Sequence, residues 1–273
     1  MEIGYKASKK LFAPGNFGDW KFCDEDHMRR VLGDNESSLK IAAMADAEKT
    51  DYHEDILPAE QSILDVIRVA TYVHQLPVAV DMIKDAADKG YEVTCNVMAI
   101  SIAQEAEIDQ ALEVLRDTPV DTVVVVDSFG ALYGEQVGRL VDKYRGALEG
   151  TGKEVGIHAH NNQQLAFANT IEAIIHGANR LDATVAGMGR GAGNCPIELL
   201  IGFLRNPSYR VRPFLEVLEE HFVALQEKLQ WGALVPYNIT GQLNQHPRTA
   251  IALVEGDEKH SYVDFYDKLV ADL

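Results

Sequence analysis

Cysteine and basic residues are both scarce in this chain of 273 residues. The three cysteines, Cys23, Cys95 and Cys195, form no C-x-x-C pair, which argues against a disulfide framework or a cysteine-rich zinc site. Lysine and arginine number 25 against 42 aspartates and glutamates, so the formal net charge is −17. Such a surface repels nucleic-acid phosphates and anionic membranes. We therefore expect neither nucleic acid nor a membrane as a partner.

Two kinds of hydrophobic segment are also missing. Residues 1–12, MEIGYKASKKLF, contain no long apolar region of the kind that a signal peptide needs. No apolar run approaches the roughly 18 residues required to span a bilayer. Because an odd number of unpaired cysteines fits a reducing compartment, we expect the protein to be cytoplasmic.

The sequence does contain a regular series of short, apolar, β-branched runs. Seven of them begin near residues 2, 39, 66, 91, 122, 154 and 180. Continuous apolar runs are typical of strands buried on both faces of a parallel sheet. Segments with helical periodicity follow most of them, so the chain reads as βαβ units. Two architectures fit this pattern, an open doubly wound sheet and a TIM-like barrel.

Polar residues gather where these runs end, which favours the barrel. They include Asn96, Asp127, His158, His160 and the segment 187–194. Barrel enzymes carry their functional groups at the carboxyl ends of many strands. We therefore predict an α/β fold of the TIM (β/α)8 type, although the runs number seven rather than eight.

The predicted organisation has two parts. Residues 1–205 form the barrel domain, and residues 206–273 form a helical extension packed on it. Within the extension, we expect a loop over residues 232–247, followed by a terminal pair of helices.

The stretch VGIHAHNNQQL places two histidines, His158 and His160, two residues apart in a predicted strand. Residues i and i+2 of a strand point to the same face, so both imidazoles can converge on one divalent cation. Paired histidines also occur as ordinary core or surface residues. The strand-end position favours the metal site, and Asn162 is placed to orient ligands or substrate.

The glycine-rich segment AGMGRGAGNCPIE, residues 186–198, follows the last predicted strand. It matches a dinucleotide-binding fingerprint in part, but it lies late in the chain and lacks the rest of a nucleotide-binding unit. Its glycines fit either a backbone approach to an anion or a tight turn. Asn194 is either a metal ligand or a helix N-cap.

Two further side chains are candidates for catalysis. Asp127 ends a strand, where it either reaches the barrel mouth or forms an ordinary strand-to-helix turn. Tyr237 lies in the predicted loop, where it acts either as a lid or acid or as a packing residue. We expect Asn96, Asn162 and Gly189 to bind substrate.

Residues 155–201 carry a recognisable set of motifs. They contain H-x-H-N, then A-N-T, then D-x-T-x-x-G-x-G-x-x-A-G-N. This combination closely resembles the metal-dependent aldolase/acyltransferase superfamily (HMGL-like), which includes 4-hydroxy-2-oxovalerate aldolases, hydroxymethylglutaryl-CoA lyases and isopropylmalate synthases. The runs near residues 66 and 122 are most similar to the aldolase branch.

The resemblance implies a TIM barrel that holds Mn²⁺ or Mg²⁺ and cleaves a 4-hydroxy-2-oxo acid to pyruvate and an aldehyde. It implies that His158 and His160 are metal ligands, that Asn194 is a candidate ligand, and that Tyr237 matches a tyrosine over the substrate. It also implies an aldehyde dehydrogenase partner. Two alternatives stay open: a Claisen-type acyl-CoA transferase or lyase, and a catalytically inactive barrel that binds a partner.

One family motif is not found in this sequence. The family's first strand carries a D-x-[ST]-L-R-D-G-G motif with a metal-binding aspartate and an arginine, whereas EIGY, at residues 2–5, looks like the family's second strand. We therefore expect a chain shortened by one βα unit, with weak metal affinity and little aldolase activity.

A barrel short of one strand also predicts association between copies, because its two open edges leave backbone groups unpaired. Sedimentation velocity should show a homo-oligomer or aggregates. A well-behaved monomer with one cooperative melt would contradict this expectation.

Overall fold

The computed structural model describes residues 1–33, 35, 37–205 and 209–271. The chain divides into two compact units. The first contains Met1–Met98, Ala103–Val124 and Tyr144–Val155; the second contains Ala99–Ile102, Val125–Lys143 and Gly156–Leu273.

The strands form a single sheet in which they follow one another in chain order. They are β1 (Glu2–Tyr5), β2 (Ala42–Asp46), β3 (Val66–Thr71), β4 (Glu92–Val97), β5 (Thr122–Asp127), β6 (Glu154–Ala159) and β7 (Arg180–Leu181). The registered pairs β1–β2, β2–β3, β3–β4 and β6–β7 are all parallel. Parallel strands joined in sequence by helices give the TIM-barrel-like α/β fold that the sequence predicted, with seven strands among the described residues.

Helices connect and follow these strands. The α-helices are α1 (Glu25–Leu32), α2 (Tyr52–Asp55), α3 (Leu76–Asp88), α4 (Glu105–Arg116), α5 (Gly134–Ala147), α6 (Ala166–Ile175), α7 (Ile197–Leu204), α8 (Val211–Val217), α9 (Val223–Leu229), α10 (Val235–Gln242), α11 (Arg248–Glu255) and α12 (Tyr262–Ala271). Short 3-10 turns are Asp19–Lys21, Ala59–Gln61, Val73–Gln75, Ile100–Ile102 and Val185–Gly187, and a π-helical turn, Leu218–Phe222, joins α8 to α9.

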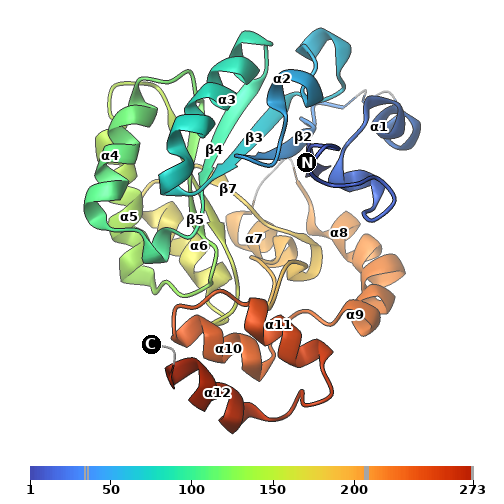
Figure 1. The fold of residues 1–273 in the computed structure, drawn as a ribbon, viewed down its shortest axis with the longest axis vertical. Coiled ribbons are helices and arrows are strands. Elements are labelled where there is room, and N and C mark those ends of the chain that lie inside the picture. Colours follow the sequence, from blue (N-terminus) through green and yellow to red (C-terminus); the bar gives the residue numbers. More distant parts are fainter. Residues whose placement is uncertain (34, 36, 206–208, 272–273) are drawn as a thin grey trace. The chain divides into compact units, whose positions relative to one another are not determined.

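The core of the first unit forms where α3 packs on β3 and β4 (Figure 1). Apolar residues at helical spacing put one face of α3 against the sheet, and Ala79, Met82 and Ile83 are fully buried there. Ile67 and Val93 of the strands are also fully buried. Burial of this kind is what a continuous β-branched run predicts for a covered parallel sheet.

Two sequence expectations about element bounds are wrong. The last strand contains only Arg180–Leu181, because the chain turns into a 3-10 helix in which Ala186 has a φ of 54°. The expected loop over residues 232–247 contains α10, since Pro236 lies in the first turn of a helix, where proline is well tolerated. Helices α10, α11 and α12 therefore lie together at the end of the chain (Figure 1).

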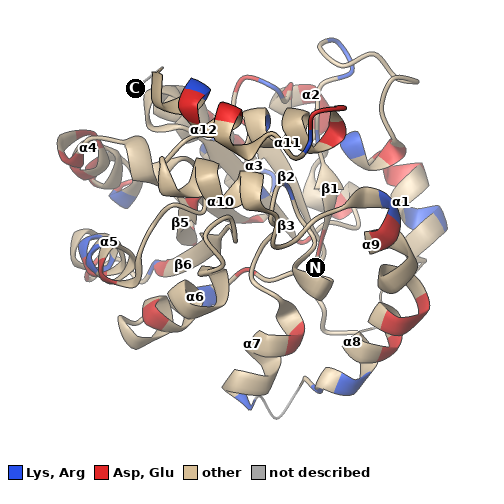
Figure 2. Ribbon diagram, turned by 90° about the horizontal axis from the view of Figure 1, so that it is seen from below, with Lys and Arg blue, Asp and Glu red and all other residues tan. Residues whose placement is uncertain are grey.

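Acidic residues, red in Figure 2, are spread along helices of the second unit, including α8 and α9. In the part of the chain that the structure describes, no helix combines the length and the apolar character needed to cross a bilayer.

Candidate functional site

The two histidines of the H-x-H motif lie side by side at the carboxyl end of β6. Their ring centroids are 5.1 Å apart and their planes are inclined by 66°. His158 is within β6, and His160 directly follows the strand and forms an isolated antiparallel bridge with Asn194. The structure thus brings together the three residues that the sequence predicted to bind a metal.

His158 is oriented by a carboxylate. Its Nδ1 lies 2.8 Å from Oδ2 of Asp182, and about a fifth to a quarter of each side chain is exposed. Because an ionised carboxylate can only accept, Nδ1 donates the proton of this hydrogen bond, and in a neutral ring Nε2 then carries the lone pair. The carboxylate therefore leaves Nε2 available to another partner.

His160 is held in its neutral form. Burial, together with the charges of His158 and Arg190, lowers the pKa of His160 well below its ordinary value. Its Nδ1 atom is buried and makes no hydrogen bond to the described residues. A neutral imidazole with an unsatisfied buried nitrogen is suited to metal coordination.

Asn194 pairs with His160 through a backbone bridge and carries an unsatisfied side-chain oxygen. Its Nδ2 donates to the carbonyl of Met188 at 3.1 Å, whereas its Oδ1 is buried without a partner among the described residues. The alternative of Asn194 as a helix N-cap is wrong, since Pro196 occupies the N-cap of α7.

These donors fit a divalent cation in number and chemistry, although they bring no negative charge. Two imidazoles and an amide oxygen are acceptable ligands for a borderline or hard divalent ion. The described ranges contain no group of three or more histidine, cysteine, aspartate or glutamate residues that could hold a metal. The candidate centre therefore depends on neutral ligands.

The glycine segment forms a tight turn that sets the position of Asn194. The backbone N–H of Asn194 donates to the carbonyl of Gly187 at 2.9 Å. A Cβ on Gly193, whose φ is +89°, would lie 1.9 Å from that same carbonyl oxygen. A Cβ on Gly189 would lie 2.4 Å from Nδ2 of Asn194. Gly193 is needed because the backbone approaches itself too closely for a side chain, whereas a Cβ on Gly189 would displace the Asn194 side chain.

Asn162 ties three segments of the second unit together. It is fully buried; its Oδ1 accepts from the N–H of Ala192 at 3.1 Å and its Nδ2 donates to the carbonyl of Phe129 at 2.8 Å. Its own carbonyl accepts from Nδ2 of Asn238 at 2.7 Å. The side chain thus fixes the positions of Phe129 and Ala192, while its orientation of ligands or substrate stays a prediction.

Asp127 makes the contacts of a strand-to-helix turn. Its two carboxylate oxygens accept from the N–H groups of Ala131 and Leu132 at 3.0 and 3.1 Å. Burial raises the pKa of Asp127 to about 6, against the opposing effect of these hydrogen bonds. Its part in catalysis stays a prediction.

Tyr237 lies in α10, not in a loop, and it is 3% exposed. It packs in a cluster with Ala192, Ala250, Phe265 and Leu269. Burial raises the pKa of Tyr237, which keeps its hydroxyl protonated. The contacts are those of a packing residue, and a position over substrate stays a prediction.

Asn96 belongs to the first unit, whereas the other predicted site residues belong to the second. Its Oδ1 accepts from Arg68 at 2.9 Å and its Nδ2 is 3.4 Å from the carbonyl of Val69.

Sequence reasoning missed two charged residues near the candidate centre, Asp182 and Arg190. Arg190 is exposed, donates to the carbonyl of Ser128 at 3.3 Å and lowers the pKa values of both His160 and His246. Strand register could have indicated Asp182. Ile157 of β6 pairs with Leu181 of β7, so the residues that follow them, His158 and Asp182, lie next to each other.

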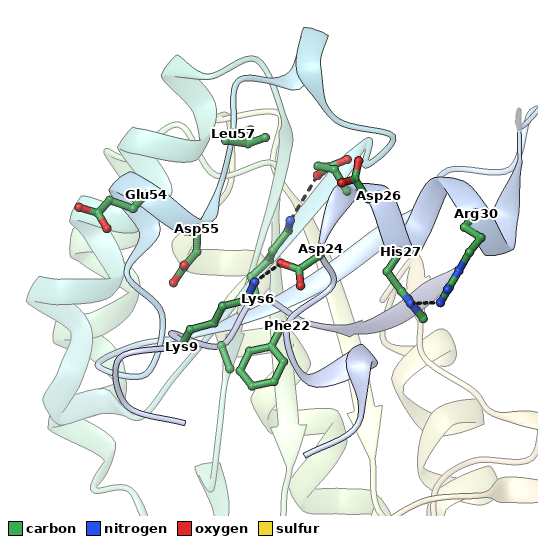
Figure 3. Close-up of a pocket in the computed structure, with 12 residues that line it drawn as sticks. Lys6, Lys9, Phe22, Asp24, Asp26, His27, Arg30, Glu54, Asp55 and Leu57 are labelled. Carbon is green, nitrogen blue, oxygen red and sulfur yellow. Dashed lines mark hydrogen bonds and ion pairs between the residues drawn. The ribbon is translucent and has the colours of Figure 1, made fainter. Parts of the chain in front are cut away.

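A separate pocket of about 730 Å³ in the first unit has charged walls (Figure 3). Its buried Lys6 donates to the carbonyl of Cys23 at 2.8 Å and to Glu25 at 3.3 Å, while Lys9 pairs with Asp24 at 2.7 Å (Figure 3). Glu25 also accepts from Ser62 at 2.7 Å. These groups hold the irregular segment after β1 in place.

The sequence and the structure were compared with protein-family models, curated proteins and solved structures. The HMGL-like family model matches residues 36–217. An oxaloacetate decarboxylase of Mycobacterium tuberculosis (strain ATCC 25618 / H37Rv) is 34% identical over 209 residues, which cover 75% of this chain and 59% of that protein. A 4-hydroxy-2-oxovalerate aldolase of Bacillus cereus (strain ATCC 10987 / NRS 248) is 35% identical over 179 residues, 62% of this chain and 51% of that protein.

Among solved structures, the N-terminal domain of a proposed aldolase from Bacteroides vulgatus has a TM-score of 0.82 and 29% identity, and covers 100% of this chain and 87% of that one. The carboxyl transferase domain of Rhizobium etli pyruvate carboxylase, with a TM-score of 0.61 and 16% identity over 84% of this chain and 42% of that one, shares the fold. The chain spans about half the length of the curated relatives it matches.

The close backbone contact at Gly193 predicts that adding a methyl group at this position strongly destabilises the fold. Gly193→Ala should lower the free energy of unfolding by about 1–3 kcal/mol, because it adds both a clash and a strained φ. Gly202→Ala is the matched control, since a Cβ there meets nothing within 4 Å and Gly202 lies inside α7, where alanine is favoured. Urea denaturation measures both variants, and equal stability of the two would refute this account of the turn.

Proposed function

This chain belongs to the HMGL-like family, and we propose that it is a divalent-metal-dependent carbon–carbon lyase. The proposed reaction is the cleavage of a 4-hydroxy-2-oxo acid to pyruvate and an aldehyde, or its reverse. The family generally uses a divalent metal, and relatives of this chain are named as aldolase and decarboxylase. The observation that carries the proposal is the pair of unsatisfied buried atoms, His160 Nδ1 and Asn194 Oδ1, beside an oriented His158.

In this proposal His158, His160 and Asn194 hold the cation, Mn²⁺ or Mg²⁺. When bound, the cation supplies Lewis-acid stabilisation of the negative charge that develops on the 2-oxo oxygen as the bond breaks. The chain's own residues keep the donors neutral and fixed: burial keeps His160 unprotonated, and the turn at Gly187 holds Asn194.

Further residues, one of them not predicted from the sequence, are proposed to act according to their chemistry. Arg190 offers an exposed guanidinium that suits the carboxylate of a 2-oxo acid. Tyr237 stays protonated, so it would donate a proton, whereas Asp127, with a pKa of about 6, would accept one. Asn162 and Gly189 are proposed to line the substrate site.

A second candidate reaction is the decarboxylation of oxaloacetate. It is favoured by the relative of that name, which aligns with three quarters of this chain. Both reactions break a carbon–carbon bond next to the same 2-oxo acid group and leave charge on the same oxygen, so one site can support either. An acyl-CoA transferase or lyase, and an inactive barrel that binds an aldehyde dehydrogenase, are the remaining alternatives.

Pyruvate release separates these reactions. The purified chain is incubated with 4-hydroxy-2-oxovalerate or with oxaloacetate, in Mn²⁺, Mg²⁺ or EDTA, against a metal blank without protein. Because the family's motif with its metal-binding aspartate and arginine is not found in this sequence, we expect slow but metal-dependent release of pyruvate from the first substrate, with an aldehyde in equal amount. His160→Ala and Asn194→Ala should each lower the rate by about 10²–10³, whereas His176→Ala, which removes an exposed histidine paired with Asp142, should not.

Release of pyruvate only from oxaloacetate would replace the aldolase by the decarboxylase. Release of free thiol from acetyl-CoA with a 2-oxo acid would favour the acyltransferase. Undiminished turnover in EDTA, or in His160→Ala, would contradict the metal-dependent lyase.

The neutral ligand set predicts that cation and substrate bind more tightly together than apart. A 2-oxo acid brings the negative charge that the three protein donors lack, so each should raise the affinity for the other. We expect the melting temperature to rise more with Mn²⁺ and pyruvate together than the sum of their separate effects. Additive shifts, or the same excess in Asn194→Ala, would count against this coupling.

A further inference from the structure

Asp182 contacts His158 through a geometry that the backbone of the sheet determines. Ile157 of β6 and Leu181 of β7 are registered partners, and the N–H of Asp182 donates to the carbonyl of Ile157 at 3.0 Å. His158 and Asp182 are the next residues on two adjacent parallel strands, so their side chains leave the sheet on the same face. The 2.8 Å contact between Nδ1 and Oδ2 is therefore built by strand pairing rather than by two flexible side chains meeting on a surface.

A carboxylate at this atom determines which ring nitrogen is free. A neutral imidazole places its proton on one nitrogen and its lone pair on the other, and the hydrogen bond of one nitrogen selects the tautomer. Histidines that bind metals usually donate their second N–H to a carboxylate or a carbonyl, and loss of that partner typically weakens metal binding by about 10- to 100-fold.

We propose that Asp182 is a positioning residue that fixes His158 as its Nδ1–H tautomer and so presents Nε2 to the cation. The inference rests on the proposed function, since it concerns the same metal centre. It adds a residue that contacts neither cation nor substrate and acts only through His158.

The alternative is an ion pair that merely stabilises the fold, and the chain contains a matched example. Nδ1 of His176 lies 2.9 Å from Oδ2 of Asp142, through the same atoms and within the same unit. That pair joins the end of α6 to α5, and the Asp142 side chain is 57% exposed. Substitutions at Asp142 therefore control for the loss of a histidine–aspartate contact that lies outside the metal centre.

The first test reads the tautomer directly in the metal-free protein. Two-bond ¹H–¹⁵N NMR correlations of the imidazoles should show His158 as the Nδ1–H form in the wild-type chain and as a mixture in Asp182→Ala. Asp182→Asn should retain the Nδ1–H form, because its amide oxygen still accepts, and Asp142→Asn should leave His158 unchanged. An unchanged tautomer in Asp182→Ala, with its circular dichroism spectrum intact, would overturn the proposal.

The second test measures Mn²⁺ affinity by titration calorimetry on the full chain. Asp182→Ala should bind Mn²⁺ about 10- to 100-fold more weakly than the wild type, Asp182→Asn should recover part of that loss, and Asp142→Ala should bind as the wild type does. If the wild-type chain binds Mn²⁺ and Asp182→Ala binds it equally well, only the positioning role fails. If the wild-type chain binds no Mn²⁺, the proposed metal centre fails, and the role of Asp182 fails with it.

Discussion

The candidate centre depends on the buried side chain of Asn162, which joins segments that are far apart in the sequence. Its side-chain amide accepts a hydrogen bond from the N–H of Ala192 in the glycine turn and donates one to the carbonyl of Phe129 after β5. Its backbone carbonyl accepts a hydrogen bond from the side chain of Asn238 in α10. A fully buried amide with both ends paired specifies one arrangement of its neighbours, because any other arrangement would leave polar groups unsatisfied. That arrangement includes the glycine turn, which carries Asn194 to its backbone bridge with His160.

The electrostatics of the centre contrast with those of the chain. The sequence has a formal net charge of −17, yet the proposed ligands are neutral and Arg190 adds a positive charge near them. In the proposed function, this contrast divides the charges at the centre between protein and substrate: the protein supplies neutral donors and a nearby guanidinium, and the 2-oxo acid supplies the negative charge.

The sequence predicted features that depend on local pattern, and it failed where distant contacts decide. Apolar β-branched runs located the strands, and the spacing of His158 and His160 placed two rings on one face. The residues of α10 predict a loop because its glycine and proline obscure a short helix, which packing through Tyr237 stabilises. The partners of Asn162 and the choice between the two roles of Asn194 required the fold, since they join residues 30 or more positions apart or depend on the exact path of a turn.

Because β7 contains only two residues, the number of residues between α6 and β7 determines where Asp182 lies. Two paired residues and the N–H of Asp182, which donates to the carbonyl of Ile157, align Asp182 with His158. The residues 176–179 connect α6 to β7, and their number determines which residue follows the pair. Inserting or deleting one residue there would turn the carboxylate to the opposite face of the sheet, so this connection should tolerate changes of side chain far better than changes of length.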